Sequence, residues 1–253
     1  MDFHGRVVVV TGGTSGIGEA CVREFHKLGA QVVLIGRDPA KADEIIASLG
    51  GGERLTAILG DVGESEFCAG AVSRVVERFG HVDVLVNSAA IMRRGDVFDL
   101  TDEDWSESFR VNVSGTFFMC REAIAVMKRN GGGAIVNVAS DWGLVGGKGH
   151  VAYCATKGAV INMTRALALD HARDGIRINA ICPGEVRTPM LASGLERRGF
   201  TPETGFEEMG KTIPIGRISE PEEQARSIRF LASDDASYMT GAILSVDGGS
   251  TTH

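Results

Sequence analysis

A tyrosine and a lysine four positions apart are the residues of this chain best suited to acid–base chemistry. Tyr153 and Lys157 fall where a helical pattern begins, and positions i and i+4 of a helix share one face. A nearby ammonium favours the ionised phenol, so the pair predicts a tyrosine whose pKa falls from about 10 towards neutrality. Ser140 ends an apolar run thirteen residues earlier, which makes a chance occurrence of the pair less plausible.

A glycine-rich segment, TGGTSGIG at 11–18, follows the first apolar run of the chain. Glycines permit positive φ and let the backbone approach a phosphate, while the N-terminus of the next helix offers unpaired N–H groups. The spacing is GxxxGxG rather than the GxGxxG of many dinucleotide-binding proteins. A tight strand-to-helix turn is the alternative interpretation, but the position directly after the first strand favours a phosphate-binding loop.

The end of the second apolar run bears on the choice of dinucleotide. NAD-binding proteins usually place an acidic residue here, where it accepts hydrogen bonds from the ribose 2′-OH. Gly36 stands at this position and Arg37 follows it. Because a guanidinium pairs with a 2′-phosphate, NADP(H) is favoured and NAD(H) remains possible. Alternatively, Arg37 is a solvated loop residue, and Asp38 is a cap for the next helix.

Short apolar runs alternate with longer amphipathic segments along the whole chain. The runs lie at 6–11, 31–36, 54–60, 82–87, 134–140, 176–182 and 242–246. The helical patterns lie at 17–29, 40–49, 65–79, 102–129, 153–173 and 221–232. The runs are rich in Val and Ile and most lack strict alternation, as in parallel strands buried on both faces. The pattern predicts one doubly wound α/β domain that spans 1–253.

The segment 188–218 interrupts this rhythm between the sixth and seventh runs. It is long, mixed in charge and punctuated by Gly and Pro, as binding loops and lids often are. Ligands of open α/β sheets bind beyond the carboxyl ends of the strands, where this segment begins. We therefore expect a substrate lid, with a merely structural excursion as the alternative.

Composition narrows the possible classes of function. The 253 residues carry a formal net charge of −7, with 43% hydrophobic and 23% charged residues. These values are typical of a globular protein, and the acidic balance argues against a nucleic-acid partner. No apolar stretch reaches the roughly 18 residues of a membrane span. The composition therefore favours an ordinary globular protein without a nucleic-acid partner.

Cysteine and histidine spacing indicates neither disulfides nor a metal site. The histidines lack the spacing of metal ligands. The first apolar run is too short for a signal peptide. We therefore expect a metal-free cytoplasmic protein with reduced thiols. The cysteines are Cys21, Cys68, Cys120, Cys154 and Cys182.

These motifs, in this order and spacing, resemble the short-chain dehydrogenase/reductase family over essentially the whole chain. The supporting residues are TGGTSGIG at 11–18, Asp61-Val62, Asn87-Ser88-Ala89-Ala90, Asn112, Ser140, Tyr153, Lys157, Pro183-Gly184, Thr188 and Val246-Asp247-Gly248-Gly249. The resemblance implies a Rossmann domain with a seven-stranded parallel sheet and helices on both faces. It also implies an NAD(P)-dependent oxidoreductase that interconverts a secondary alcohol and a ketone, and it makes a homotetramer the expected assembly.

The resemblance assigns a role to each of four catalytic residues. Tyr153 would be the general acid and base, and Lys157 would lower its pKa and bind the nicotinamide ribose. Ser140 would polarise the carbonyl, and Asn112 would anchor a water in a proton relay. Because this set is complete, it disfavours the alternative of a non-catalytic dinucleotide-binding regulatory protein.

The resemblance and the glycine-rich loop together imply a set of cofactor-binding residues. Asp61 and Val62 would flank the adenine, and Thr188 would contact the carboxamide. The family's usual NNAG segment is Asn-Ser-Ala-Ala here, so the methyl group of Ala90 would crowd the cofactor slightly. The implied residues are Gly12, Thr14, Ser15, Gly16, Ile17, Gly18, Arg37, Asp61, Val62, Asn87, Ala89, Tyr153, Lys157, Pro183, Gly184, Val186 and Thr188.

The substrate is less legible in the sequence. Met92, Arg94, Trp142 and His150 are the predicted pocket residues. Arg93 and Arg94 make the segment similar to family members that act on sugar acids, such as gluconate 5-dehydrogenases and deoxygluconate dehydrogenases. An arginine binds a carboxylate in a bidentate manner, but both could also form surface ion pairs. A sugar, polyol or sugar acid is therefore predicted.

The alternative substrate is a 3-oxoacyl thioester, by general resemblance to acyl-carrier-protein reductases of the family. Such a substrate needs an apolar channel under the 188–218 segment. It would also suit basic residues at the mouth of that channel, where Arg197 and Arg198 are the candidates.

Overall fold

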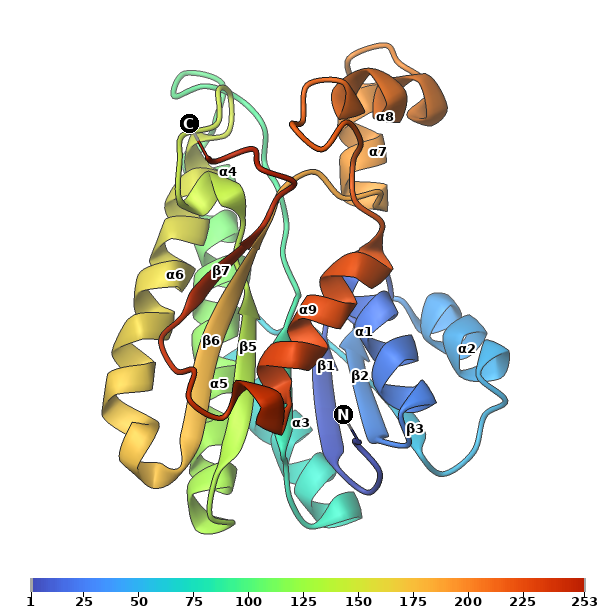
Figure 1. The fold of residues 1–253 in the computed structure, drawn as a ribbon, viewed down its shortest axis with the longest axis vertical. Coiled ribbons are helices and arrows are strands. Elements are labelled where there is room, and N and C mark those ends of the chain that lie inside the picture. The colour runs from blue at the N-terminus through green and yellow to red at the C-terminus, as the bar shows by residue number, and fades with distance from the viewer. Residues whose placement is uncertain (1, 253) are drawn as a thin grey trace.

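The computed structural model, which describes residues 2–252, contains a seven-stranded parallel sheet with the order β3-β2-β1-β4-β5-β6-β7 (Figure 1). The bounds of every strand lie within two residues of a predicted apolar run, so the predicted fold class is confirmed. The strands are β1 (Val7–Thr11), β2 (Gln31–Gly36), β3 (Leu55–Leu59), β4 (Val84–Asn87), β5 (Gly133–Val138), β6 (Ile176–Pro183) and β7 (Ile243–Val246).

Helices connect the strands and cover both faces of the sheet (Figure 1). The predicted helix over 102–129 is not continuous, because a π-helical turn, Arg110–Ser114, separates α4 from α5. The other difference lies in the 188–218 segment, which contains two short helices, α7 and α8. The helices are α1 (Gly16–Lys27), α2 (Pro39–Ser48), α3 (Ser65–Phe79), α4 (Asp102–Phe109), α5 (Gly115–Arg129), α6 (Val151–His171), α7 (Pro189–Glu196), α8 (Pro202–Gly210) and α9 (Pro221–Ala232).

Successive valines of β1 explain why the apolar runs lack alternation. Val7 and Val9 belong to a core shared with α3 and α5, whereas Val8 and Val10 belong to the opposite core, shared with α1 and α9. All four are buried. Because side chains alternate across a strand, a sheet covered on both faces needs apolar residues at every position.

Helix starts follow the signals present in the sequence. Asp38 is the N-cap of α2, and its carboxylate accepts a hydrogen bond from the backbone N–H of Lys41 at 3.2 Å. Glu220 caps α9, and Glu223 completes a capping box there. The interpretation of Asp38 as a helix cap is therefore confirmed.

The 188–218 segment stands beyond the carboxyl ends of the strands as a small helical unit (Figure 1). Its buried residues form a separate apolar cluster, with Leu191, Ala192 and Met209 packed against it. This cluster holds α7 and α8 together beside the rest of the domain. The cluster residues are Leu195, Phe206, Ile213 and Ile218.

No helix within residues 2–252 is both long enough and apolar enough to cross a membrane.

Candidate active site

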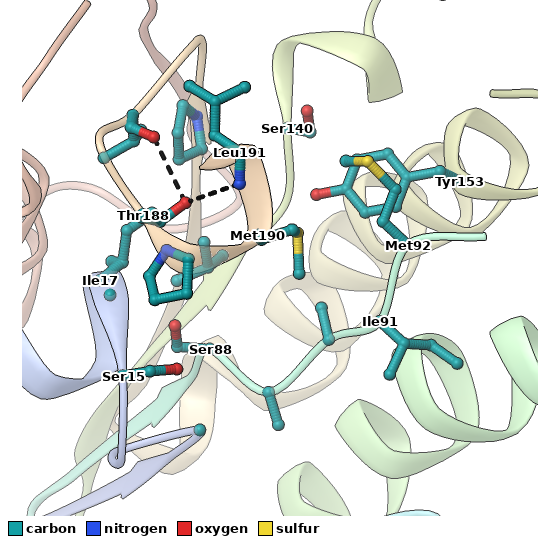
Figure 2. Close-up of a pocket in the computed structure, with 18 of the residues that line it drawn as sticks. Ser15, Ile17, Ser88, Ile91, Met92, Ser140, Tyr153, Thr188, Met190 and Leu191 are labelled. Carbon is teal, nitrogen blue, oxygen red and sulfur yellow. Dashed lines mark hydrogen bonds between the residues drawn. The ribbon is translucent and has the colours of Figure 1, made fainter. Parts of the chain in front are cut away.

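A cavity of about 760 Å³ lies at the carboxyl ends of the central strands. The loop after β1, the segments after β4, β5 and β6, the start of α6, and α7 all contribute to its walls. Ser140 and Tyr153 lie at one end, which is called the substrate end below (Figure 2). Ser15, Ile17 and Thr188 lie at the other end. The cavity brings together most of the predicted cofactor residues, three of the four catalytic residues and all four predicted substrate residues.

The glycine-rich loop has the shape that a pyrophosphate group requires. Gly12 has φ +67°, and a Cβ there would lie 2.8 Å from the backbone nitrogen of Ala89. A Cβ at Gly18 would overlap the carbonyl group of Gly12. Ser15 is the N-cap of α1 but makes no capping hydrogen bond with its side chain. The first turn of α1 therefore keeps N–H groups for an anion, and the residues present fit a dinucleotide.

A side chain at Gly36, at the end of β2, would collide with the side chain of Thr14. A Cβ at Gly36 would lie 2.5 Å from the methyl carbon of Thr14, so a larger residue would displace that side chain. Arg37, which follows, is exposed and lines the cavity. Among the described residues, no hydrogen bond or ion pair engages its guanidinium. Arg37 therefore keeps its donors for a ligand.

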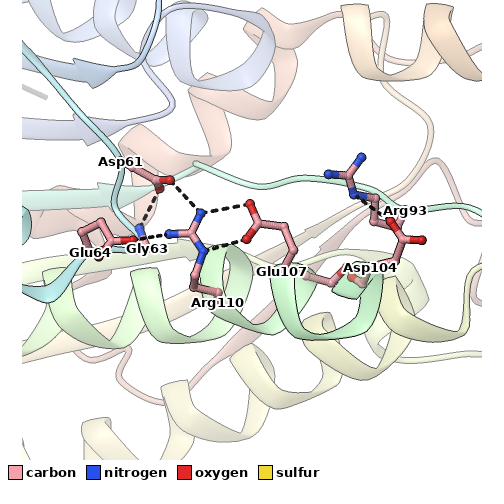
Figure 3. Close-up of polar contacts among 8 residues, drawn as sticks. Asp61, Gly63, Glu64, Arg93, Asp104, Glu107 and Arg110 are labelled. Atoms are coloured by element: carbon pink, nitrogen blue, oxygen red, sulfur yellow. Dashed lines mark hydrogen bonds and ion pairs between the residues drawn. The ribbon is translucent and has the colours of Figure 1, made fainter. Parts of the chain in front are cut away.

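An ion cluster around Arg110 includes Asp61 (Figure 3). Asp61 lines the cavity, as Arg37 does. The Arg110 guanidinium donates to Asp61 at 2.7 Å, to Glu64 at 2.9 Å and to Glu107 at 2.6 Å. Burial alone would raise the pKa of Asp61, but hydrogen bonds from Arg110 and from the backbone of Gly63 lower it overall. Asp61 is therefore a fixed, ionised acceptor. The role of Arg110 was not predicted, since two of its three partners, Asp61 and Glu64, lie more than 40 residues away in sequence.

Tyr153 and Lys157 lie at the other end of the cavity, and both are buried. Burial raises the pKa of Tyr153, the charge of Asp141 raises it further, and the Ser140 hydroxyl lowers it. The Lys157 ammonium donates to the carbonyl oxygen of Val138 at 2.7 Å, and burial lowers its pKa to about 8. The Lys157 ammonium lies 5.5 Å from the centroid of the Tyr153 ring, and burial is the largest influence on the Tyr153 pKa, so a Tyr153 pKa lowered by Lys157 stays a prediction.

Ser140 is tied to the residue that follows it. Its hydroxyl donates to the Asp141 carboxyl group at 2.9 Å, and the backbone N–H of Trp142 donates to the same oxygen at 2.8 Å. Asp141 is buried, and this burial raises its pKa. Asp141 thereby fixes the side chain that faces the substrate end of the cavity.

Trp142 and His150 form an aromatic wall beside Tyr153. The Trp142 ring lies 4.2 Å from the His150 ring and 6.2 Å from the Tyr153 ring, centroid to centroid. Burial lowers the pKa of His150, and the charge of Arg94 lowers it further. His150 is therefore a neutral wall residue at physiological pH.

Asn112 lies behind the cavity rather than in its wall. Its side-chain oxygen accepts from the backbone N–H of Ile91 at 2.8 Å, and its amide nitrogen donates to the Ile91 carbonyl at 2.9 Å. The same nitrogen donates to Thr156 at 3.1 Å. Asn112 stands on the π-helical turn, a feature that is frequent at functional sites. It therefore fixes the chain segment that leads from β4 to the pocket.

Two predicted cofactor residues also lie outside the cavity wall. The Asn87 amide donates to Asn137 at 2.9 Å and to the Cys120 sulfur at 3.2 Å, so its side chain belongs to a buried network between β4 and β5. Gly18 stands behind the loop, against the carbonyl group of Gly12. Both residues therefore support the cavity from behind its wall, and a contact of either one with a cofactor stays a prediction.

The two consecutive arginines have different surroundings. The Arg94 guanidinium lines the cavity, donates to the carbonyl oxygen of Met190 at 2.8 Å and lies against the bare backbone of Gly194. The Arg93 guanidinium lies 3.4 Å from Asp104 (Figure 3) and does not line the cavity. The structure therefore keeps Arg94 as a pocket residue and assigns Arg93 to a surface ion pair.

Sequence reasoning missed several residues of the substrate end. Glu185 lies directly after Pro183-Gly184, where β6 ends, and burial raises its pKa to about 7. Its position at a strand end was a usable signal, whereas the apolar residues of α7 and α8 could not be assigned without the fold. The missed apolar lining residues are Met190, Leu191, Leu195 and Met209.

Comparison with known proteins agrees with this arrangement. The family described as enoyl-(acyl carrier protein) reductase matches residues 12–251. Meso-2,3-butanediol dehydrogenase of Serratia marcescens is 41% identical over 251 residues, which cover 99% of this chain and 96% of that protein. Oxidoreductase UcpA of Escherichia coli is 38% identical over 252 residues, which cover 98% and 95%. Actinorhodin polyketide ketoreductase, solved with NADPH, has a TM-score of 0.93 at 35% identity and 98% coverage of both chains.

The parallel sheet, the glycine-rich loop and the cavity at the strand ends define a Rossmann-type oxidoreductase. The chain belongs to the short-chain dehydrogenase/reductase family, whose members bind NAD(P)(H).

Proposed function

We propose that this oxidoreductase interconverts a secondary alcohol and a ketone, with Tyr153 as the general acid and base. The observation that carries the proposal is the convergence of Ser140, Tyr153 and Lys157 on one end of a cavity whose other end fits a dinucleotide. The experiment that tests it is substitution of Tyr153 by phenylalanine, which is expected to reduce kcat for ketone reduction by at least about a thousandfold.

The pocket residues divide the work of the reaction. The cofactor, when bound, supplies or accepts the hydride. In reduction, the protonated Tyr153 hydroxyl gives its proton to the carbonyl oxygen as the alcohol forms, and in oxidation the phenolate removes it. Ser140 donates a hydrogen bond to the same oxygen. The substrate oxygen competes with the Asp141 carboxyl group for this hydrogen bond. The buried Lys157 ammonium stabilises the phenolate as it forms.

NADP(H) is the proposed cofactor. Gly36 excludes the acidic side chain that would accept hydrogen bonds from a ribose 2′-OH, and Arg37 offers a guanidinium without a protein partner among the described residues. A guanidinium matches a phosphate in charge and shape.

A sugar, polyol or sugar acid is the proposed substrate, held by Arg94 and enclosed by the 188–218 lid. The Arg94 guanidinium has donors left beyond its bond to Met190, and two lid residues, Leu195 and Met209, line the same cavity. Trp142 and His150 supply the flat wall on which a sugar ring packs.

Arg94→Ala is expected to lower kcat/KM for the best substrate by about tenfold or more, because a charged hydrogen bond is lost. Arg93→Ala is the matched control, since its ion pair with Asp104 lies outside the cavity. Steady-state rates measured from nicotinamide absorbance compare the two variants. Equal rates for Arg94→Ala and wild type on every active compound would contradict the assignment.

A 3-oxoacyl thioester is the second candidate substrate. Met190, Leu191 and Met209 give the cavity an apolar side, and Arg197 and Arg198 also line it. An acidic carrier protein would meet these arginines at the mouth. Measuring reduction of a 3-oxoacyl thioester beside that of hydroxylated ketones separates the two candidates.

A homotetramer is the proposed assembly. Phe117 on α5 is 42% exposed and Leu169 on α6 is 84% exposed, and such apolar side chains favour burial against another chain. Met119 of α5 is fully buried and does not add to such a face. Sedimentation velocity at micromolar concentration is expected to give a single species of tetramer mass. A monomer would refute the assembly.

The cytoplasm is the proposed location, because the described chain carries five unpaired cysteines, most of them buried. Thiols in this state suit a reducing compartment.

A further inference from the structure

Glu185 lies just beyond the carboxyl end of β6, in the wall of the cavity. It follows β6 by two residues and lines the cavity with Ser140 and Tyr153. Its backbone is fixed, because its carbonyl oxygen accepts from the N–H of Ser219 at 2.9 Å and the next residue, Val186, forms a β-bridge to Ser219. The side chain therefore projects from a rigid support into the reaction site.

The carboxyl group of Glu185 has no hydrogen-bond or ion-pair partner within residues 2–252. Only the backbone oxygen of Glu185 accepts a hydrogen bond there, and the two side-chain oxygens accept none. Two other carboxyl groups of the cavity wall differ in this respect, since Asp141 accepts hydrogen bonds and Asp61 is held by Arg110. A partly buried carboxyl group without partners is costly, and a ligand that donates a hydrogen bond removes that cost.

The charges around Glu185 define the group that it would accept. Arg94 and Arg198 act on it from the positive side and Asp141 from the negative side. An anionic substrate group placed between Glu185 and Asp141 would be repelled. A hydroxyl group both donates and accepts, so it can donate to Glu185 while it accepts from Arg94. A neutral hydroxyl group satisfies both side chains.

We infer that Glu185 is a specificity-determining residue that binds a second hydroxyl group of the substrate, close to the reacting carbon. The inference rests on the proposed function and narrows its substrate to hydroxyketones and the corresponding diols or polyols. Arg94 is then a donor to the hydroxyl group rather than a clamp for a carboxylate.

The first test compares kcat/KM for reduction of 3-hydroxy-2-butanone with that for 2-butanone. At pH above the Glu185 pKa of about 7, where the carboxylate is ionised, we expect wild type to prefer the hydroxyketone. Glu185→Gln is expected to lower this preference by about tenfold or more, because hydrogen bonds to charged groups are the stronger ones. Glu196→Gln is the matched control: it removes an exposed carboxylate of α7 outside the cavity, and the preference should persist.

The second test measures binding without turnover. Dissociation constants of the two ketones are determined by NMR titration for the NADPH-loaded Tyr153→Phe enzyme, with and without Glu185→Gln. Tighter binding of the hydroxyketone that is lost in Glu185→Gln supports the inference. Equal binding of both ketones, or a preference that survives Glu185→Gln, overturns it. Because binding needs no proton transfer, this outcome is independent of whether Tyr153 is the catalytic acid.

Discussion

Replacement of Tyr153 by phenylalanine is expected to reduce kcat for ketone reduction by at least about a thousandfold, the scale of a lost general acid. The phenol is buried at the substrate end of the cavity, and burial together with Asp141 keeps it protonated. Phenylalanine keeps the ring that packs against Trp142 but carries no proton to give. The measurement is the initial rate of NADPH oxidation with a ketone that the wild-type enzyme reduces.

Cofactor binding is the control that separates a catalytic loss from a folding defect. The Tyr153→Phe enzyme is expected to bind NADPH with its wild-type dissociation constant, because the phosphate loop and Arg37 lie at the other end of the cavity. Tyr238→Phe is the matched substitution, since Tyr238 is the other tyrosine and is fully exposed. Wild-type turnover by Tyr153→Phe would end the proposed mechanism.

Arg37→Ala is expected to weaken NADPH binding by about tenfold to a hundredfold while leaving the affinity for NADH close to that of wild type. The guanidinium would pair with the 2′-phosphate, which NADH lacks, so only one of the two cofactors loses a contact. Fluorescence titration of both reduced cofactors gives the two dissociation constants.

Arg226→Ala is the matched control for this substitution, because Arg226 is an exposed arginine of α9 outside the cavity. Equal affinities of the wild-type enzyme for NADPH and NADH would mean that Arg37 points into solvent. An equal loss for both cofactors in Arg37→Ala would mean that it contacts a group that they share.

The strands could be predicted closely because burial on both faces leaves a simple sequence signature. Val7–Thr11 is apolar at nearly every position, and both cores of the sheet require this. The π-helical turn at Arg110–Ser114 could not be predicted, since the amphipathic pattern runs through it. The helices α7 and α8 are short and stabilised by one another, so neither leaves a long periodic pattern.

The sequence could predict that Tyr153 and Lys157 share one helix, but not the electrostatics around them. The spacing of Tyr153 and Lys157 places both on one helix, whereas their protonation depends on groups distant in sequence. The Val138 carbonyl engages the ammonium, and the Asp141 carboxyl group raises the phenol pKa. The hydrogen bonds of Asn87 could not be predicted for the same reason. Its partners, Asn137 on β5 and Cys120 on α5, come close to it only in the folded chain.

Transfer of deuterium tests most directly whether the enzyme moves a hydride from NADPH to a ketone with Tyr153 as the acid. The enzyme is incubated with 3-hydroxy-2-butanone and NADPH that carries deuterium at the transferable C4 position, and the product is analysed by mass spectrometry and NMR. We expect one deuterium on the new carbinol carbon, at one face only, and no such product with Tyr153→Phe. Formation of the alcohol without deuterium at that carbon, or equal product from Tyr153→Phe, would contradict it.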